Sequence, residues 1–324
     1  MWRAAKRVIG VRVKDALARA RAALRAAKYA TPALDAEVLL AHVLACERVE
    51  LYARPERELS AGQVQQYREL LGRRLKGEPV AYLTGRKEFM GLDFLVTPAV
   101  LIPRPETELL VETALELLGA LETPLVADVG TGSGAVAVSI ACRHPGAVVY
   151  ALDIAEAALE VARANARRHR VADRLIFLAG DLLDALGRQL EGQFDLVCAN
   201  LPYVPREELP YLPREVRYEP RVAVDGGPGG LELYRRLVPQ AARFLKPGGR
   251  LLIEIDPRQS EAARSLLPAP VWNVKIVRDL AGRDRLVVAA ITGRKSEAGP
   301  ERQGKKQGPQ ASCGDGKPEA EERQ

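Results

Sequence analysis

The stretch LVADVGTGSGAVAVSIA, residues 125–141, decides the fold of this chain. An apolar run reaches Asp128, and a glycine-rich turn then leads into a helix. Glycine adopts positive φ angles and lets the backbone approach a ligand closely, and the start of a helix adds unpaired N–H groups. We therefore predict a strand, a ligand-binding turn and a helix, with the turn formed by Gly130, Thr131, Gly132, Ser133 and Gly134.

A carboxylate follows at the end of the next predicted strand. Asp153 lies 23 residues after Gly130, where an acidic side chain can bind the hydroxyls of a ribose. A glycine-rich turn by itself also fits NAD, but Asp128 before the glycines and the GxGxG spacing favour S-adenosylmethionine. Asp181 and Leu182 follow the third predicted strand and are expected to border the adenine; an alternative role for Asp181 is to cap a short helix.

Apolar strands alternate with helices from residue 125 onward, which predicts an α/β fold with a mostly parallel sheet covered on both faces. The last two apolar stretches, 271–277 and 285–291, are joined by a link too short for a helical crossover, so we expect an antiparallel C-terminal strand. The other predicted strands are 125–129, 148–153, 175–179, 194–199 and 250–255, and the clearest helices are 155–169 and 231–245.

The remaining segments predict a domain order. Helical spacing over 13–27 and 34–46, and a helix after the N-cap candidate Ser60, predict a small bundle within residues 1–78, with Leu34 among the residues that face its core. Residues 79–103 are rich in β-formers and broken by glycines and a proline, which predicts a β-hairpin linker. The α/β domain then covers 104–294, and residues 295–324 lack any apolar periodicity and are expected to be disordered.

Composition narrows the class of protein. The chain has 324 residues, 47% of them hydrophobic, and no apolar run approaches the ~20 residues of a membrane span. Four cysteines without a CxxC pair and only three histidines argue against a disulfide scaffold and a metal site. The net charge is +6, but nine basic residues and one acidic residue lie within the first 30. The near-neutral remainder does not indicate a nucleic-acid-binding surface, so we expect a cytoplasmic protein without a membrane or direct nucleic-acid partner.

The second chemical motif is NLPY, residues 200–203, directly after the predicted strand FDLVCA. The carboxyl ends of parallel strands line the ligand crevice, so this motif is expected to face the same site as the glycine turn. Asn200 and the backbone carbonyl of Leu201 offer two acceptors, Pro202 stiffens the turn, and Tyr203 presents a flat ring. This set suits a planar NH2 group, because the two acceptors can hold its hydrogens while the ring stacks on its plane.

NLPY resembles the (N/D)PPY motif of class I methyltransferases that modify planar amino or amide nitrogens. TPALDAEVLLAHVL near the start of the chain, and the four stretches listed at the end of this paragraph, resemble the protein-(glutamine) methyltransferases that act on peptide-chain release factors. The resemblance spans residues 13–291, and LIPRPETE is its most specific part. The other stretches are PVAYLTGRKEFMGLDFLVTPAVLIPRPETELLVE (79–112), EPRVAVDGGPGGLELYRRL (219–237), FLKPGGRLLIEI (244–255) and DLAGRDRLVVA (279–289).

This resemblance implies a Rossmann-like class I methyltransferase domain that moves a methyl group from S-adenosylmethionine to a glutamine side-chain amide in the Gly-Gly-Gln loop of release factors. Asn200, Pro202 and Tyr203 are then the expected catalytic residues, and Asn200 is also expected to contact the cofactor. Arg104, with Glu106 and Thr107, is expected to help close the cofactor pocket. The expected substrate-binding residues are Phe89, Arg104, Asn200, Leu201, Pro202 and Tyr203.

One departure keeps alternatives open. The family's usual motif is NPPY, so Leu201 replaces a proline at a position that acts through its backbone carbonyl. NLPY is familiar from ribosomal-RNA adenine dimethylases, which makes an adenine methyltransferase acting on RNA or DNA an alternative, although the near-neutral body argues against phosphate binding. A glutamine methyltransferase for a ribosomal protein is a second alternative, and a non-catalytic factor that binds release factors through residues 1–78 is a third.

Overall fold

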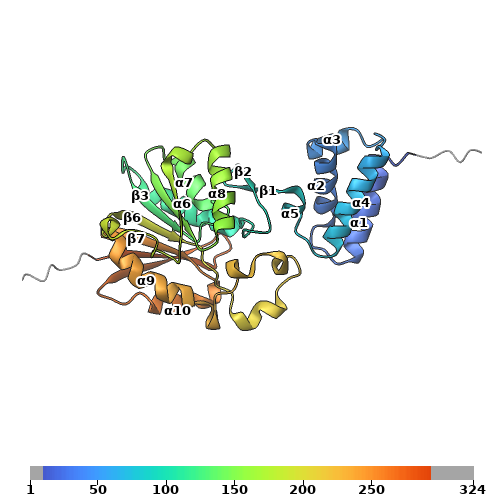
Figure 1. Ribbon diagram of the computed structural model, residues 1–324. Helices are drawn as coiled ribbons and strands as arrows, with labels where there is room; N and C mark the ends of the chain where they lie inside the picture. Colours follow the sequence, from blue (N-terminus) through green and yellow to red (C-terminus); the bar gives the residue numbers. More distant parts are fainter. Residues whose placement is uncertain (1–9, 293–324) are drawn as a thin grey trace, which may run out of the picture. The chain divides into compact units, whose positions relative to one another are not determined.

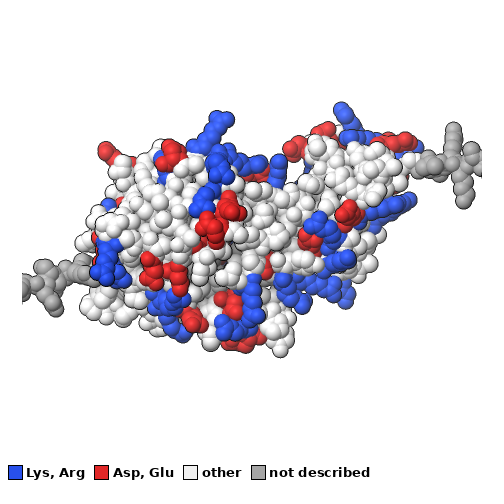
Figure 2. Space-filling view, in the orientation of Figure 1, with Lys and Arg blue, Asp and Glu red and all other residues white. Residues whose placement is uncertain are grey.

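The computed structural model of this chain describes residues 10–292, so the predicted tail at 295–324 lies outside the described residues. Along the chain, a helical bundle is followed by a short hairpin segment and an α/β domain (Figure 1). Over the described range, no helix is both long enough and apolar enough to cross a membrane. Basic and acidic side chains are interspersed on the face that Figure 2 shows, rather than gathered into one field of a single sign.

The bundle has a hydrophobic core formed by side chains of its longer helices, including Leu17, Leu39 and Leu70. Ser60 caps the last of these helices as predicted: its Oγ accepts from the Gln63 N–H at 3.2 Å, and the Gln63 side chain accepts from the Ser60 N–H at 3.0 Å. The helices are α1 (Val13–Ala26), α2 (Pro32–Leu44), α3 (Arg48–Ala53) and α4 (Ala61–Leu75).

The buried face of α2 differs from the prediction. Leu34 is 42% exposed, whereas Asp35 and Glu37 are buried. Asp35 accepts from Arg74 of α4 at 2.8 Å, and Glu37 accepts from Arg21 of α1 at 2.7 Å. Because arginines from other helices neutralise these carboxylates, they can be buried where an apolar pattern would place a leucine.

The segment predicted as a hairpin linker, 79–103, contains the hairpin and a helix that was not predicted. This helix, α5 (Val80–Thr84), ends at Gly85, whose φ is +71°. The strands β1 (Arg86–Phe89) and β2 (Leu92–Leu95) pair antiparallel. Residues 96–103 then lie outside regular helix and strand.

The α/β domain is built on a seven-stranded sheet with the order β5-β4-β3-β6-β7-β9-β8. Strands β3 to β7 pair in parallel, and β9 runs antiparallel to its neighbours β7 and β8, as predicted. Four strands have the predicted bounds, whereas β7 begins at Leu245 rather than at residue 250. The strands are β3 (Leu125–Val129), β4 (Val148–Asp153), β5 (Leu175–Ala179), β6 (Phe194–Ala199), β7 (Leu245–Glu254), β8 (Trp272–Arg278) and β9 (Asp284–Ile291).

Helices cover both faces of this sheet (Figure 1). Side chains alternate along β3, so that Val126 joins the core under α6 and α7 while Ala127 joins the core under α9 and α10. The helix α8 packs against β4 and β5. The helices are α6 (Glu108–Leu118), α7 (Ala135–Arg143), α8 (Glu156–Arg168), α9 (Glu232–Phe244) and α10 (Ser260–Ser265).

Candidate active site

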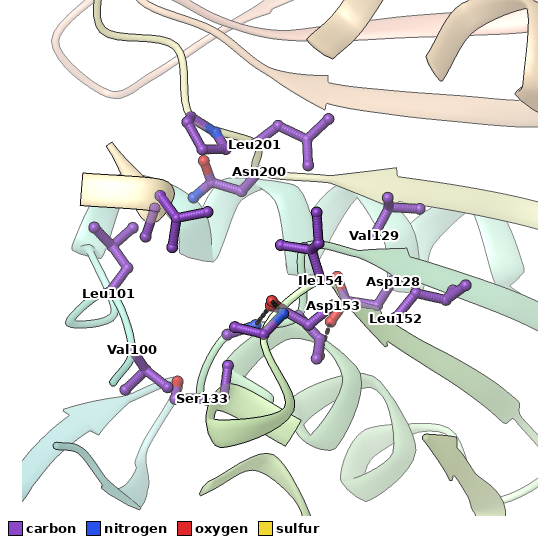
Figure 3. A pocket seen from close by; sticks show the side chains of 18 of the residues that line it. Val100, Leu101, Asp128, Val129, Ser133, Leu152, Asp153, Ile154, Asn200 and Leu201 are labelled. Atoms are coloured by element: carbon purple, nitrogen blue, oxygen red, sulfur yellow. Dashed lines mark hydrogen bonds between the residues drawn. The ribbon is translucent and has the colours of Figure 1, made fainter. Parts of the chain in front are cut away.

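A cavity opens at the carboxyl ends of β3, β4, β5 and β6 (Figure 3). The chain passes outward from β3 to β4 and β5 and then returns to β6 on the other side of β3. Open α/β sheets bind ligands at such a reversal of strand order. The glycine turn and the NLPY motif therefore share one cavity. The predicted site residues that line it are Arg104, Gly130, Thr131, Gly132, Ser133, Asp153, Asp181, Leu182, Asn200, Leu201 and Pro202.

The glycine turn between β3 and α7 is held against the neighbouring strand. The N–H groups of Gly130 and Thr131 donate to the Leu152 carbonyl at 2.8 and 2.9 Å. Gly130 has a φ of +73°, and a Cβ at this position would lie 2.9 Å from the side chain of Leu201. Only glycine therefore allows the turn to approach the NLPY motif this closely.

Asp153 ends β4 beside this turn. Its Oδ2 accepts from the Gly132 N–H at 2.9 Å, and its Oδ1 accepts from the Ala155 N–H at 2.9 Å. Burial raises the pKa of this carboxyl in spite of both bonds. The next residue, Ile154, is 61% exposed and lines the cavity, where Figure 3 shows it beside Asp153. The Asp153 carboxylate could accept from ribose hydroxyls, and the exposed Ile154 side chain could contact a flat ring attached to that ribose.

Asp128 supports the turn from within the domain. Its Oδ2 accepts from the Thr131 hydroxyl at 2.6 Å and from the Ala137 N–H at 3.2 Å. The side chain is buried, and burial raises its pKa to about 6. This carboxylate therefore joins the glycine turn to the first turn of α7.

Asp181 and Leu182 follow β5 at the edge of the cavity. Residues 181–186 form turns rather than a helix, so the alternative in which Asp181 caps a short helix is wrong. Instead, Arg236 of α9 donates a hydrogen bond to the Asp181 carboxylate. Asp181, Leu182 and Arg236 all line the cavity.

The side-chain amide of Asn200, directly after β6, is oriented by Thr107. Its Nδ2 donates to the Thr107 Oγ1 at 2.9 Å. Burial raises the pKa of the Glu254 carboxyl, at the end of β7, to about 7, while the nearby Thr107 side chain lowers it. With Nδ2 held in this way, the Oδ1 of Asn200 is left as an acceptor at the cavity.

The backbone of Leu201 is held by Tyr234 of α9. The Leu201 N–H donates to the Tyr234 Oη at 3.1 Å. The Tyr234 hydroxyl lies 2.6 Å from the Glu254 carbonyl oxygen and 3.3 Å from the Leu201 carbonyl oxygen. Because a hydroxyl has one proton and the shorter contact is the stronger, the Leu201 carbonyl keeps its acceptor capacity for a ligand.

Arg104 lies where the resemblance places it, on the wall of the cavity. It is paired with Glu219, whose side chain is buried, in the long segment between β6 and α9. Val222 and Ala223 of the same segment also line the cavity. This ion pair therefore fastens part of the segment beside the predicted cofactor pocket.

Four predicted site residues, Phe89, Glu106, Gly134 and Tyr203, do not line the cavity. Phe89 is buried in the core with α6 and α7, edge-on to Phe94 at 6.0 Å between ring centroids, so the expectation that it walls a substrate slot is wrong. Tyr203 packs against the core on the opposite face of the sheet. Gly134 is the N-cap residue of α7, and a Cβ there would lie 3.1 Å from that of Ala162, so helix packing accounts for this glycine.

Comparison with known proteins places this site in a family. Residues 15–85 match the family model for the PrmC N-terminal domain, and residues 125–279 match one for a methyltransferase domain. The release factor glutamine methyltransferase of Moorella thermoacetica is 47% identical over 279 residues, which cover 86% of this chain and 98% of that protein. The chain belongs to the release factor glutamine methyltransferase family. The protein of that name from Koribacter versatilis is 45% identical over 269 residues, or 82% of this chain and 93% of that one.

The fold of this release factor glutamine methyltransferase family member is that of class I methyltransferases. A crystal structure of the hMettl16 catalytic domain in complex with MAT2A 3'UTR hairpin 6 matches with a TM-score of 0.50 at 15% identity. The match covers 67% of this chain and 83% of that one, and it bears on the fold alone.

Several residues that build this methyltransferase site were missed from the sequence. Tyr234 of α9 is remote in sequence from Leu201, whose N–H donates to its hydroxyl, and from Glu254, whose backbone carbonyl accepts from it. A signal existed for Glu254, because a glutamate is unusual inside an apolar run such as LLIEI. Ile154 was missed because an apolar residue after a strand has no distinctive pattern of its own.

Proposed function

We propose that this protein transfers a methyl group from S-adenosylmethionine to the side-chain amide nitrogen of the glutamine in the Gly-Gly-Gln loop of peptide chain release factors. The observation that carries the proposal is the pair of acceptors at the cavity, the Asn200 Oδ1 and the Leu201 carbonyl, each held by another side chain. The names of the relatives support the substrate class.

The residues after β3 and β4 fit S-adenosylmethionine. The turn has open space beside Gly132, where an added Cβ would meet no atom within 4 Å. The Asp153 carboxylate, which accepts from two backbone N–H groups, retains lone pairs for ribose hydroxyls. Ile154 and Leu182 offer apolar surface for the adenine. When bound, S-adenosylmethionine supplies a methyl group on a positively charged sulfur, which a nucleophile in line with that bond can accept.

The contribution of the chain itself is to orient the amide. An amide nitrogen is a poor nucleophile, because its lone pair is delocalised into the carbonyl. Acceptors at Asn200 and Leu201 would hold its two hydrogens, fix its position and stabilise positive charge as it develops on the nitrogen. The proton can leave after transfer, so the reaction needs no strong base. Pro202 would restrict the backbone between these acceptors and Tyr203.

We further propose that the bundle recognises the release factor. A glutamine in a loop offers little surface, so affinity must come from contacts with other parts of the folded partner. The bundle is the part of the chain that matches the PrmC N-terminal domain, and it contributes no residue to the cavity.

A labelling experiment tests the substrate. The full chain is incubated with methyl-labelled S-adenosylmethionine and, in parallel, with release factor, release factor whose loop glutamine is replaced by alanine, ribosomal protein, and RNA. We expect label in the unaltered release factor only. Label in RNA would instead support the adenine methyltransferase, and label in the ribosomal protein would support the other glutamine methyltransferase.

A further inference from the structure

The carbonyl of Leu201 is one of the two acceptors at the cavity, and its direction depends on the backbone angles of Leu201. Because Pro202 follows, the ψ angle of Leu201 is confined to the extended region, but its φ angle keeps a wide range. A change in this φ angle would swing the carbonyl away from the cavity. A contact from outside the NLPY motif is needed to fix it.

Tyr234 of α9 makes that contact. Its side chain is fully buried, in the same core as the side chain of Leu201. The Leu201 N–H donates to the Tyr234 Oη at 3.1 Å, and the hydroxyl donates to the Glu254 carbonyl oxygen, 2.6 Å away at the end of β7. Burial raises the pKa of this hydroxyl well above its ordinary value, so it keeps its proton at neutral pH. The hydroxyl therefore joins the N–H of Leu201 to a strand of the sheet.

The position of Tyr234 on α9 separates its contact with Leu201 from contact with a ligand. Leu233 and Arg236 of this helix line the cavity, whereas Tyr234 does not. Its side chain lies instead with that of Leu237 in the core between α9 and the sheet. Removing the Tyr234 hydroxyl would therefore alter no residue that lines the cavity, but it would leave the Leu201 N–H without its partner. Any effect on the reaction must then act through the position of Leu201.

We propose that Tyr234 is a positioning residue for methyl transfer, whose hydroxyl fixes the Leu201 backbone so that the Leu201 carbonyl can accept from the amide that is methylated. The inference rests on the proposed function. It has a specific consequence, because a proline at position 201 would have no N–H to donate, and its ring would fix the φ angle covalently. The Tyr234 hydroxyl should therefore matter when residue 201 is leucine and not when it is proline.

The test is a double-mutant cycle between Leu201→Pro and Tyr234→Phe, which removes the hydroxyl and keeps the ring. Tyr150→Phe is the matched control, because Tyr150 of β4 packs against the same core and does not line the cavity. Single-turnover methylation is measured with saturating S-adenosylmethionine and release factor. Calorimetry measures cofactor affinity, and circular dichroism checks that each variant is folded.

We expect Tyr234→Phe to slow methylation by about tenfold or more, since a small displacement of a positioning group can cost up to about a hundredfold. Cofactor affinity should be unchanged, and Tyr150→Phe should match the wild type. In the Leu201→Pro background, Tyr234→Phe should slow methylation by less than about twofold, because the bond it removes is already absent.

Two results would overturn this inference alone: a folded Tyr234→Phe protein with the wild-type rate, or an equal loss of rate from Tyr234→Phe in both backgrounds. If Leu201→Pro does not fold, the comparison of Tyr234→Phe with Tyr150→Phe decides, and equal rates in these two variants would overturn it. A wild type that does not methylate release factor would overturn the proposed function and the inference with it.

Discussion

Two buried carboxyl groups of the α/β domain, those of Asp128 and Glu254, have pKa values of about 6 and about 7 because burial disfavours their charged forms. A carboxyl whose pKa rises on folding binds its proton more tightly in the folded state. The free energy of unfolding therefore falls as the pH rises through the interval between the unfolded and folded pKa values. At neutral pH, each of these two carboxyl groups therefore lowers the free energy of unfolding relative to an uncharged side chain in the same place.

Glu254→Gln should therefore stabilise the protein. Above about pH 7.5, we expect the free energy of unfolding to rise by roughly 1–3 kcal/mol, since the variant has no carboxyl to ionise in the interior. Below about pH 3.5, well under the usual glutamate pKa, the carboxyl is protonated in both states and the difference should vanish. Urea unfolding at both pH values measures this. Destabilisation at the higher pH would contradict the assignment of a buried, unfavourably charged Glu254.

Asp153→Ala should weaken the binding of S-adenosylmethionine by roughly 1.5–3 kcal/mol, through the loss of charge-assisted bonds to the ribose. The variant also releases the Gly132 N–H, which loosens the glycine turn. Isothermal calorimetry measures the affinity, with Glu156→Ala as the control, because Glu156 is an exposed carboxylate of the neighbouring helix α8. Wild-type affinity in a folded Asp153→Ala protein would rule out its role in ribose binding.

At the scale of elements, the carboxyl ends of the parallel strands determine where the site lies, and these ends could be predicted from the sequence. Strands β3 to β6 are short apolar runs with glycine, proline or polar residues at or near their ends, so local sequence determines their limits. Their order in the sheet then follows from the short connections of the α/β pattern. The glycine turn and the NLPY motif therefore fall at one edge of the sheet.

The features that local sequence did not predict depend on residues far away. The buried face of α2 is set by Arg74, 39 positions after Asp35, and an apolar pattern cannot indicate that pairing. Phe89 looked available for a substrate slot, but the hairpin that carries it packs against α6 and α7. The orientation of Asn200 depends on Thr107, which lies 93 positions earlier in the chain.

The turn after β6 should tolerate proline at its second position. Leu201→Pro keeps the backbone carbonyl that we assign to the substrate amide, so we expect single-turnover methylation within a few-fold of the wild type. The substitution removes the N–H that donates to Tyr234 at 3.1 Å, which should lower the free energy of unfolding by about 1 kcal/mol. Rapid-quench kinetics and urea unfolding measure the two effects. A folded Leu201→Pro protein that has lost methylation would show that the leucine itself is required.

At the scale of the whole molecule, the positive charge of the bundle could raise the rate at which a partner protein associates. Arg19, Arg25 and Lys28 are exposed on or just after α1. If they steer an acidic partner, replacing all three by glutamine should slow association with release factor several-fold at low salt, and high salt should remove the difference. The matched control replaces Arg235, Arg264 and Lys275, which are exposed on the α/β domain. Stopped-flow association rates that fall equally in both variants would contradict steering by the bundle.

The most direct test of the account is tandem mass spectrometry of release factor after a single turnover. The account predicts one added methyl group, located on the side-chain amide of the glutamine in the Gly-Gly-Gln loop. It also predicts that Asn200→Ala forms this product about a hundredfold more slowly, as the loss of one preorganised polar contact typically does. A methyl group on another residue, or a folded Asn200→Ala protein that methylates the glutamine at the wild-type rate, would contradict the central claim that the acceptors at Asn200 and Leu201 orient this amide for transfer.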